Sequence, residues 1–275
     1  MSRSRIPILM YHQIDVAPPK GTPLRGLVVS PGTFSRHMSL MHFLGYTGLS
    51  MGALMPYLRG EKTGKVFGIT FDDGYENNFH NALPVLRRLR FSATCYAVAA
   101  RLGQSNIWDI DEGVGQVSLM DTAQLQSWID AGQEVGSHTS HHIDLTACNP
   151  QHLEPEIAGS RRLLEAVLRQ PGGVQHFCYP YGRFGAASLD HTAQAAYVSA
   201  TTTQRGRATV PLQGGALTLP RVLVSRSTTW VHLLLKCFTA YEDRRGQRLV
   251  SVPLPSTAPA SHTGSHQSAR HTGRS

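Results

Sequence analysis

The sequence lacks the features of several protein classes. None of its apolar runs approaches the roughly 18 residues that a transmembrane helix needs. Its first residues, M-S-R-S-R-I-P-I-L-M-Y-H, contain neither the apolar core nor the small-residue cleavage site of a secretory signal. Its 4 cysteines are widely spaced and form no Cys-x-x-Cys pair, so we expect free thiols in a reducing compartment. We therefore expect a cytoplasmic protein with no transmembrane segment.

Charged residues are also scarce, at 16% of the chain. The 26 Lys and Arg outnumber the 18 Asp and Glu, which gives a formal net charge of +8. The densest basic groups, at 87–90 and 244–248, contain no aromatic residues of the kind that stack on nucleic-acid bases. We therefore expect no nucleic-acid partner.

The patterns that are present alternate between strand and helix. Apolar, β-branched runs at 66–71, 91–98 and 134–138 are separated from one another by amphipathic segments, and further such segments lie at 30–44 and 150–169. Repeated β–α units predict parallel strands covered by helices, in an open doubly wound sheet or in a closed barrel. The nucleotide-binding motifs G-x-G-x-x-G and G-x-x-x-x-G-K-[ST] are both missing, and their absence favours the barrel. Both folds place their chemistry at the carboxyl ends of the strands.

The composition changes near Ser251. From there to Ser275 the chain is rich in Pro, Ser, Thr, Gly, His and Arg and has almost no apolar residues. Burial cannot offset the entropy lost on ordering such a segment. We predict one folded domain over residues 1–250 and a disordered tail over residues 251–275.

Two acids stand side by side where the strand at 66–71 ends. Asp72 and Asp73 are followed by Gly74, and this sequence is typical of a polar turn. The alternative is a site in which the two carboxylates have different roles. One would bind a cation and stay ionised, while its neighbour would accept a proton. Other residues must distinguish a turn from a site.

Histidines follow a second strand end, in the stretch E-V-G-S-H-T-S-H-H at 134–142. Either His141 or His142 can share one side of the chain with His138. Two histidines and a carboxylate, here Asp73, form a common ligand set for a catalytic divalent metal with open coordination positions. Such a metal activates water and polarises a carbonyl, so the set favours hydrolysis of an amide or ester. The alternative is that these histidines are only polar loop residues.

Three stretches at predicted strand ends carry a family resemblance. They are T-F-D-D-G at 70–74, S-H-T-S-H-H-I-D-L at 137–145 and F-C-Y-P-Y-G at 177–182. In this order they resemble the first three motifs of the NodB-type polysaccharide deacetylases, carbohydrate esterase family 4. The resemblance implies an α/β fold, a distorted (β/α)7 barrel called the NodB homology domain, over residues 1–250. It also implies a hydrolase that removes N-acetyl or related acyl groups from amino sugars of a polysaccharide or glycan precursor.

The resemblance assigns roles to the acids and histidines. Asp72 would be the general base. Asp73, His138 and His142 would be the ligands of a divalent metal, and the family pattern favours His142 over His141. Zn²⁺ fits such a ligand set best, although other first-row ions bind similar sites.

The third motif would contact the substrate. The backbone N–H of Tyr181 would help to stabilise the oxyanion, and the aromatic rings of the motif would flank a sugar. The residues concerned are Tyr179, Pro180, Tyr181 and Gly182. A strand that ends in a proline turn is the structural alternative.

The chain also departs from the family pattern. The third motif usually contains an arginine that orients the base, and this arginine is missing. The late Leu-x-His motif that supplies the general acid is not recognisable. His12, at the end of the first predicted strand, could supply the proton, and Arg221 in L-P-R could replace the missing arginine. Three residues on the loop after 91–98 could also reach the site: Asn106, Trp108 and Asp109.

The missing motifs leave a second function open, a catalytically impaired relative that only binds carbohydrate. The intact set of Asp72, Asp73, His138 and His142 favours the enzyme. An Fe(II) oxygenase with two histidines and a carboxylate would be expected on a β-sandwich-like fold. The alternation of strands and helices disfavours this third function.

Overall fold

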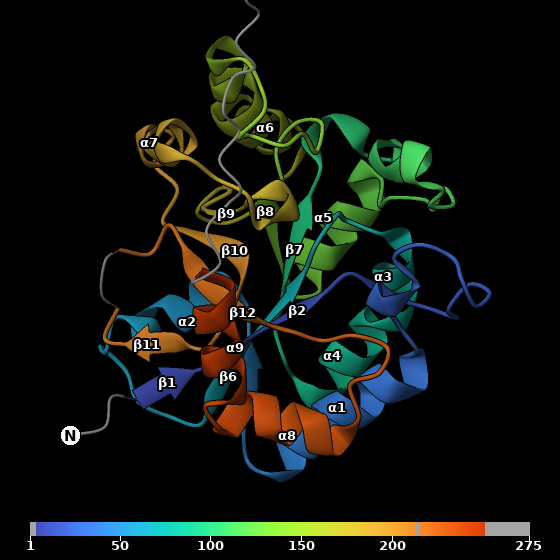
Figure 1. Ribbon diagram of the computed structural model, residues 1–275, viewed down its shortest axis with the longest axis vertical. Helices are drawn as coiled ribbons and strands as arrows, with labels where there is room; N and C mark the ends of the chain where they lie inside the picture. The colour runs from blue at the N-terminus through green and yellow to red at the C-terminus, as the bar shows by residue number, and fades with distance from the viewer. Residues whose placement is uncertain (1–3, 213–214, 251–275) are drawn as a thin grey trace, which may run out of the picture.

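A closed barrel of seven parallel strands forms the centre of the computed structural model, which describes residues 4–212 and 215–250 (Figure 1). Pairing between the first and last strands of the ring closes it. In spatial order the strands are β2 (Ile8–Tyr11), β12 (Leu219–Leu223), β10 (Ser199–Arg205), β9 (His176–Cys178), β8 (Glu134–Ser137), β7 (Thr94–Ala97) and β6 (Val66–Phe71). The predicted distorted (β/α)7 barrel is confirmed. The predicted tail at 251–275 lies outside the described residues.

Short strands extend the barrel. β5 (Thr47–Leu49) pairs with the first half of β6, on the edge that β7 uses further along. β1 (Ser4–Ile6) pairs with β11 (Ala208–Val210), the one antiparallel pair of named strands in the described part of the chain. β3 (Gln13–Ile14) pairs with β4 (Val28–Val29) beyond the end of β2.

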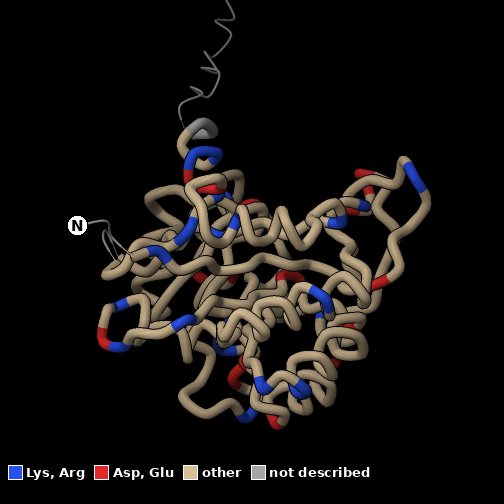
Figure 2. Tube along the Cα trace, turned by 90° about the horizontal axis from the view of Figure 1, so that it is seen from below, with Lys and Arg blue, Asp and Glu red and all other residues tan. Residues whose placement is uncertain are grey.

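Helices surround the barrel, as Figure 1 shows. They are α1 (Pro31–Phe43), α2 (Met51–Leu58), α3 (Glu76–Asn81), α4 (Leu83–Leu89), α5 (Thr122–Asp130), α6 (Leu153–Val167), α7 (Ala186–Gln194), α8 (Trp230–Phe238) and α9 (Tyr241–Val250). Within the described residues, none of them combines the length and the apolar character that crossing a bilayer requires. Lys and Arg occur at separated places along the trace (Figure 2).

Local sequence signals set where several helices begin. The Ser30 hydroxyl accepts a hydrogen bond from the Thr33 N–H at the start of α1, and Pro31 occupies the first turn, where its missing N–H costs nothing. Asp121 and Gln124 form a reciprocal capping box at the start of α5. Such caps satisfy backbone donors that the helix itself leaves unpaired.

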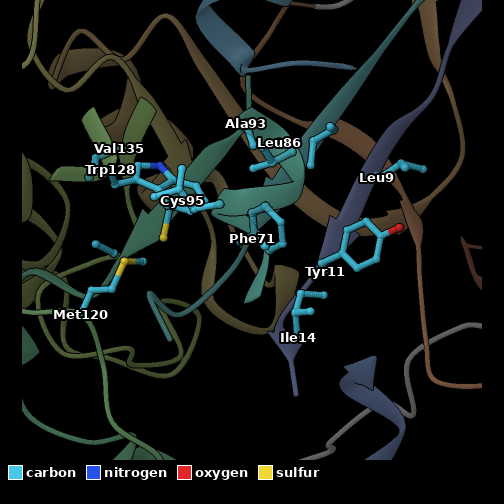
Figure 3. Close-up of a cluster of buried hydrophobic side chains, with 14 of the residues drawn as sticks. Leu9, Tyr11, Ile14, Phe71, Leu86, Ala93, Cys95, Met120, Trp128 and Val135 are labelled. Atoms are coloured by element: carbon cyan, nitrogen blue, oxygen red, sulfur yellow. The ribbon is translucent and has the colours of Figure 1, made fainter. Parts of the chain in front are cut away.

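The alternation of side chains along β6 separates the core from the site. Phe67, Ile69 and Phe71 belong to the hydrophobic core that the helices cover. Figure 3 shows Phe71 between Tyr11 and Trp128 in this core, where the ring centroids lie 5.7 and 5.9 Å from that of Phe71. Burying each such side chain contributes about 1.5–3 kcal/mol. Because successive residues of a strand face opposite sides, Thr70 and Asp72 face the barrel interior.

Ion pairs fasten α9 to the barrel. Glu242 is fully buried and accepts hydrogen bonds from Arg205 Nε and Nη2, at 2.6 and 2.7 Å. Lys236 Nζ on α8 lies 3.0 Å from the same carboxylate. The neighbouring Asp243 pairs with Arg207 at 2.8 Å. A buried carboxylate with two cationic partners depends on both of them, because an unpaired charge there would be costly.

Replacing Glu242 by Gln should lower the free energy of unfolding by about 3 kcal/mol at neutral pH, because it leaves buried cations without their counter-charge. Burial raises the pKa of Glu242, but hydrogen bonds from Arg205 and Lys236 outweigh it and lower the pKa overall. The contribution of Glu242 to the free energy of unfolding is therefore present above its unfolded-state pKa. It is lost as the pH falls through its folded-state pKa. Urea unfolding at neutral and at acid pH measures both effects.

The control is Glu61→Gln, which removes an exposed carboxylate 4.0 Å from Arg59. We expect it to change the free energy of unfolding by less than about 0.5 kcal/mol. If Glu242→Gln were as stable as the wild type at neutral pH, the ion pairs would not hold α9 in place.

Candidate active site

Asp72, directly after β6, is held by a buried arginine. Its two carboxylate oxygens accept hydrogen bonds from Arg221 Nη1 and Nη2, at 2.6 and 2.7 Å. The same guanidinium donates to the Thr70 hydroxyl, the Thr202 carbonyl and the Cys178 sulfur. Burial raises the pKa of Asp72, but the Arg221 guanidinium outweighs it and leaves the pKa below its usual value. Asp72 is thus a rigidly held carboxylate that stays ionised at neutral pH.

Asp73 faces a different pair of partners. Its Oδ1 lies 3.3 Å from His138 Nε2 and 3.3 Å from His142 Nε2, and all three side chains are buried. Burial raises the pKa of Asp73, but the contacts with His138 and His142 hold it well below its usual range. The two adjacent acids therefore have separate surroundings, as the functional interpretation of Asp-Asp-Gly predicted.

The structure brings His142, and not His141, to Asp73. The His141 ring is about half exposed and its Nδ1 lies 2.6 Å from Glu156 Oε1 on α6. Glu156 Oε2 also accepts the backbone N–H groups of Ser140 and His141. This carboxylate fixes the loop after β8 with His141 turned outward.

Unusual backbone conformations gather at this site. Asp73, Thr139, His142 and Tyr181 have φ angles of 72°, 65°, 60° and 57°, in the left-handed region that non-glycine residues seldom adopt. Such conformations cost free energy and persist where the surrounding structure enforces them, often at functional sites. At Gly182, φ is 69° and a Cβ atom would collide with Thr203. These residues are therefore held in place by their neighbours.

His12 lies beside Asp72. His12 Nε2 is 3.9 Å from Asp72 Oδ2, and its side chain is 15% exposed. The Asn78 side chain donates to the His12 carbonyl at 2.7 Å and fixes the end of β2. In the described part of the chain, His12 Nδ1 is buried without a hydrogen-bond partner. The strand-end position predicted from the sequence thus brings His12 to the two acids.

The third motif is divided between the core and the site. The prediction that its rings flank a sugar is wrong for Tyr179, because this ring is fully buried and packs against Phe177 and Phe184. Pro180 is buried too. Tyr181 is 41% exposed and its ring centroid lies 4.8 Å from that of His142. Tyr181 is therefore the ring of this motif that can meet a ligand.

Comparison with known proteins agrees with this geometry. The family described as polysaccharide deacetylase matches residues 59–200, a range that includes both acids, both histidines and the third motif. The chain belongs to the polysaccharide deacetylase family. It is therefore a hydrolase of the class that acts on carbon–nitrogen bonds other than peptide bonds. His12 and Arg221 lie outside the matched range.

Individual relatives support the assignment. YxkH of Bacillus subtilis (strain 168), whose name places it in the polysaccharide deacetylase family, is 30% identical over 224 residues, or 81% of this chain and 72% of YxkH. The chitooligosaccharide deacetylase of Sinorhizobium fredii is 28% identical over 129 residues, which span 46% of this chain and only 52% of that protein.

Solved structures show the same deacetylase fold. The Streptococcus pyogenes deacetylase PplD, in complex with acetate, has 26% identity and a TM-score of 0.73, covering 86% of this chain and 99% of PplD. The polysaccharide deacetylase BC0361 of Bacillus cereus has 28% identity and a TM-score of 0.71, covering 85% of this chain and 69% of BC0361.

Polysaccharide deacetylases generally depend on a metal, and the residues around Asp73 fit one. Ligand atoms of Asp73, His138 and His142 lie within 4.8 Å of one another. His138 Nδ1 is 2.7 Å from the Cys178 carbonyl, which can only accept, so this nitrogen donates and Nε2 is left to face Asp73. Imidazole and carboxylate lone pairs that converge in a buried place require a proton or a cation between them.

A second set of three ligand atoms, from Asp72, His138 and Cys178, also lies within 4.8 Å. Arg221 contacts both the Asp72 carboxylate and the Cys178 sulfur. A guanidinium already provides positive charge there and would repel a cation. Of the two sets, Asp73, His138 and His142 are therefore the better candidates for metal ligands.

Two residues that contribute to the site, Cys178 and Thr70, are not predicted from the sequence. Cys178 contacts the guanidinium of Arg221 with its sulfur and orients His138 with its carbonyl. Thr70 accepts a hydrogen bond from Arg221 at 3.0 Å. Thr70 lies in T-F-D-D-G and Cys178 in F-C-Y-P. Their contacts with Arg221 join different strands, and the sequence of a single motif does not predict such contacts.

Replacing His142 by Ala should weaken Zn²⁺ binding by more than about 100-fold. Loss of a residue that only hydrogen-bonds to a metal ligand already lowers metal affinity by about 10- to 100-fold, and loss of a ligand itself should lower it further. Replacing the adjacent His141 by Ala should leave Zn²⁺ affinity within about threefold, since that ring faces Glu156. Competition with a chromophoric chelator measures both affinities. Equal losses in the two variants, or a larger loss for His141→Ala, would refute the ligand assignment.

Proposed function

We propose that this deacetylase removes N-acetyl or related acyl groups from amino sugars of a polysaccharide or glycan precursor, with a divalent metal as cofactor. The observation that carries the proposal is that two neighbouring acids have different partners. Asp72 is bound to Arg221, and Asp73 faces His138 and His142. One acid is available for proton transfer and the other for a cation.

Amino-sugar oligomers suit this site as substrates because the relative from Sinorhizobium fredii is named a chitooligosaccharide deacetylase. Bound by Asp73, His138 and His142, a divalent cation would polarise the acyl carbonyl and lower the pKa of water. The two imidazole nitrogens and one carboxylate oxygen of this set favour Zn²⁺ among the divalent first-row metal ions.

Asp72 serves as the general base in this proposal. A carboxylate has about four lone pairs, and the two parallel bonds from Arg221 occupy one on each oxygen. The others remain available to accept a proton from the attacking water. Arg221 also fixes the direction of these lone pairs, so it would replace the arginine that is missing from the third motif.

His12 serves as the proton donor to the departing amine. The support for this role is its distance of 3.9 Å from Asp72, on the side of the barrel where the strands end. An amine leaves readily only when it is protonated, so a group of this kind is required. The backbone N–H of Tyr181 would bind the oxyanion that forms when water adds to the acyl carbon.

Replacing Asp72 or His12 by Asn should each lower kcat by about 10²- to 10⁴-fold, because each change removes a proton-transfer group and leaves a polar side chain in its place. The assay is acetate release from an N-acetylglucosamine oligomer, with bound metal measured in parallel. Metal content should not change. Full activity in Asp72→Asn would exclude it as the base, and full activity in His12→Asn would exclude it as the acid.

The control for both variants is His80→Asn, which changes an exposed histidine on α3 whose ion-pair partner is Glu76. It should retain wild-type kcat. A wild-type protein that binds metal and releases no acyl group from any amino-sugar oligomer would contradict the proposed function and favour a relative that only binds carbohydrate.

Replacing Arg221 by Lys should lower kcat by about 10- to 100-fold, because Lys keeps the charge but cannot make two parallel bonds to Asp72. Arg205→Lys is the matched control, since Arg205 also donates two parallel bonds to the two oxygens of one carboxylate, that of Glu242. It should reduce stability and leave kcat unchanged. If both variants kept wild-type kcat while remaining folded by circular dichroism, Arg221 would have no role in orienting the base.

A further inference from the structure

A short helix between β7 and α5 lies against the metal-ligand candidate His142. This 3₁₀ helix, Ile107–Glu112, carries Trp108, whose ring stacks on His142 with centroids 4.4 Å apart and planes 26° apart. Tyr181 meets the same imidazole edge-on at 4.8 Å. His142 is therefore enclosed by two aromatic rings, one from the third motif and one from this helix.

Backbone hydrogen bonds fix the segment around this helix to the end of β6. The Met120 N–H donates to the Gly74 carbonyl, and the Glu76 N–H donates to the Ser118 carbonyl, both at 2.9 Å. The Asn106 side chain, fully buried, accepts from the Val117 N–H at 2.6 Å and closes the loop on itself. The helix is thus attached directly after Asp72 and Asp73, and its side chains are preorganised.

Asp109 on this helix has a buried carboxylate to which the proposed mechanism gives no role. It is only 5% exposed, and no Lys, Arg or His of the described residues lies within ion-pair distance of it. It belongs to neither of the ligand sets found among the described residues. A carboxylate buried without a cationic partner is costly, so such groups usually have a function.

Asp109 lies near the reacting groups, because the ring of its chain neighbour Trp108 stacks on His142. Burial raises the pKa of Asp109 to about 6, with further contributions from the negative charges of Asp73 and Glu112, while the Trp108 indole opposes the rise. Burial likewise raises the pKa of Tyr181 to about 12, and the charge of Asp109 is the next contribution. Both pKa shifts agree with a position of Asp109 close to Asp73 and to the exposed ring of the third motif.

We propose that Asp109 is a substrate-binding residue that accepts a hydrogen bond from the amino-sugar chain. The donor is a sugar hydroxyl group, or the ammonium group of a sugar that has already lost its acyl group. Both present N–H or O–H donors to a carboxylate, and a charged acceptor makes the stronger bond. This inference rests on the proposed deacetylase function and adds a specificity-determining contact to it.

The test compares the wild type with Asp109→Asn, which keeps the shape of the side chain and removes its charge. The substrates are a fully N-acetylated chitooligosaccharide and the same oligomer after partial deacetylation. We expect KM to rise about 10- to 100-fold, as for the loss of a charged hydrogen bond. We expect kcat to change less than about threefold and bound metal to stay the same. Asp111→Asn, an exposed acid on the same helix, should match the wild type.

The two substrates distinguish the two donors. A larger rise in KM for the partly deacetylated oligomer identifies an ammonium partner, and equal rises identify a hydroxyl partner. Unchanged KM for both oligomers would overturn the proposal, and so would a fall in kcat with KM unchanged.

A binding measurement separates this inference from the proposed function. Calorimetry of the same oligomers with Asp72→Asn, and with Asp72→Asn combined with Asp109→Asn, reports binding without turnover. Weaker binding in the double variant supports the role of Asp109 even if the wild type released no acetate. Equal binding would overturn it even if the wild type were an active deacetylase.

Discussion

The buried ion pair between Asp72 and Arg221 is the contact on which the arrangement of the site depends. The two residues lie 149 positions apart, and the closed barrel brings them together. Neither charge could be buried alone, so each requires the other. The same guanidinium also reaches Thr70 on β6, Cys178 on β9 and Thr202 on β10. The Arg221 side chain therefore links Asp72 to four strands of the barrel, β6, β9, β10 and β12.

This pairing gives two adjacent acids different chemical environments. Successive residues of a strand face opposite sides, so Asp72 continues the inward row of β6 that Thr70 begins. Asp73 leaves the strand with a φ of 72° and turns its carboxylate to the histidines. Aspartate tolerates this left-handed conformation better than most residues. This turn of the backbone gives the proposed general base and the adjacent metal-ligand candidate different surroundings, although they are neighbours in the chain.

Periodicity predicted those parts of the fold whose sequence agrees with their environment. β6, α5 and α6 were recognisable because their apolar spacing matches the faces that they bury. α2 was not predicted, because it contains Pro56 and is apolar on most sides. Burial of Met51, Leu54, Met55 and Leu58 stabilises it nevertheless. Tertiary packing here outweighs local propensity, which no pattern within the segment reveals.

The sequence by itself determined the barrel class, the paired acids at a strand end and the family, because these depend on local order along the chain. Only the tertiary structure decided which neighbours each side chain meets. His141 contacts Glu156 and not Asp73. Tyr179 is buried in the core, and the Trp108 ring stacks on His142. These outcomes depend on contacts between segments far apart in the chain. Strand pairing and burial set such contacts, and a motif specifies only residue types and their spacing.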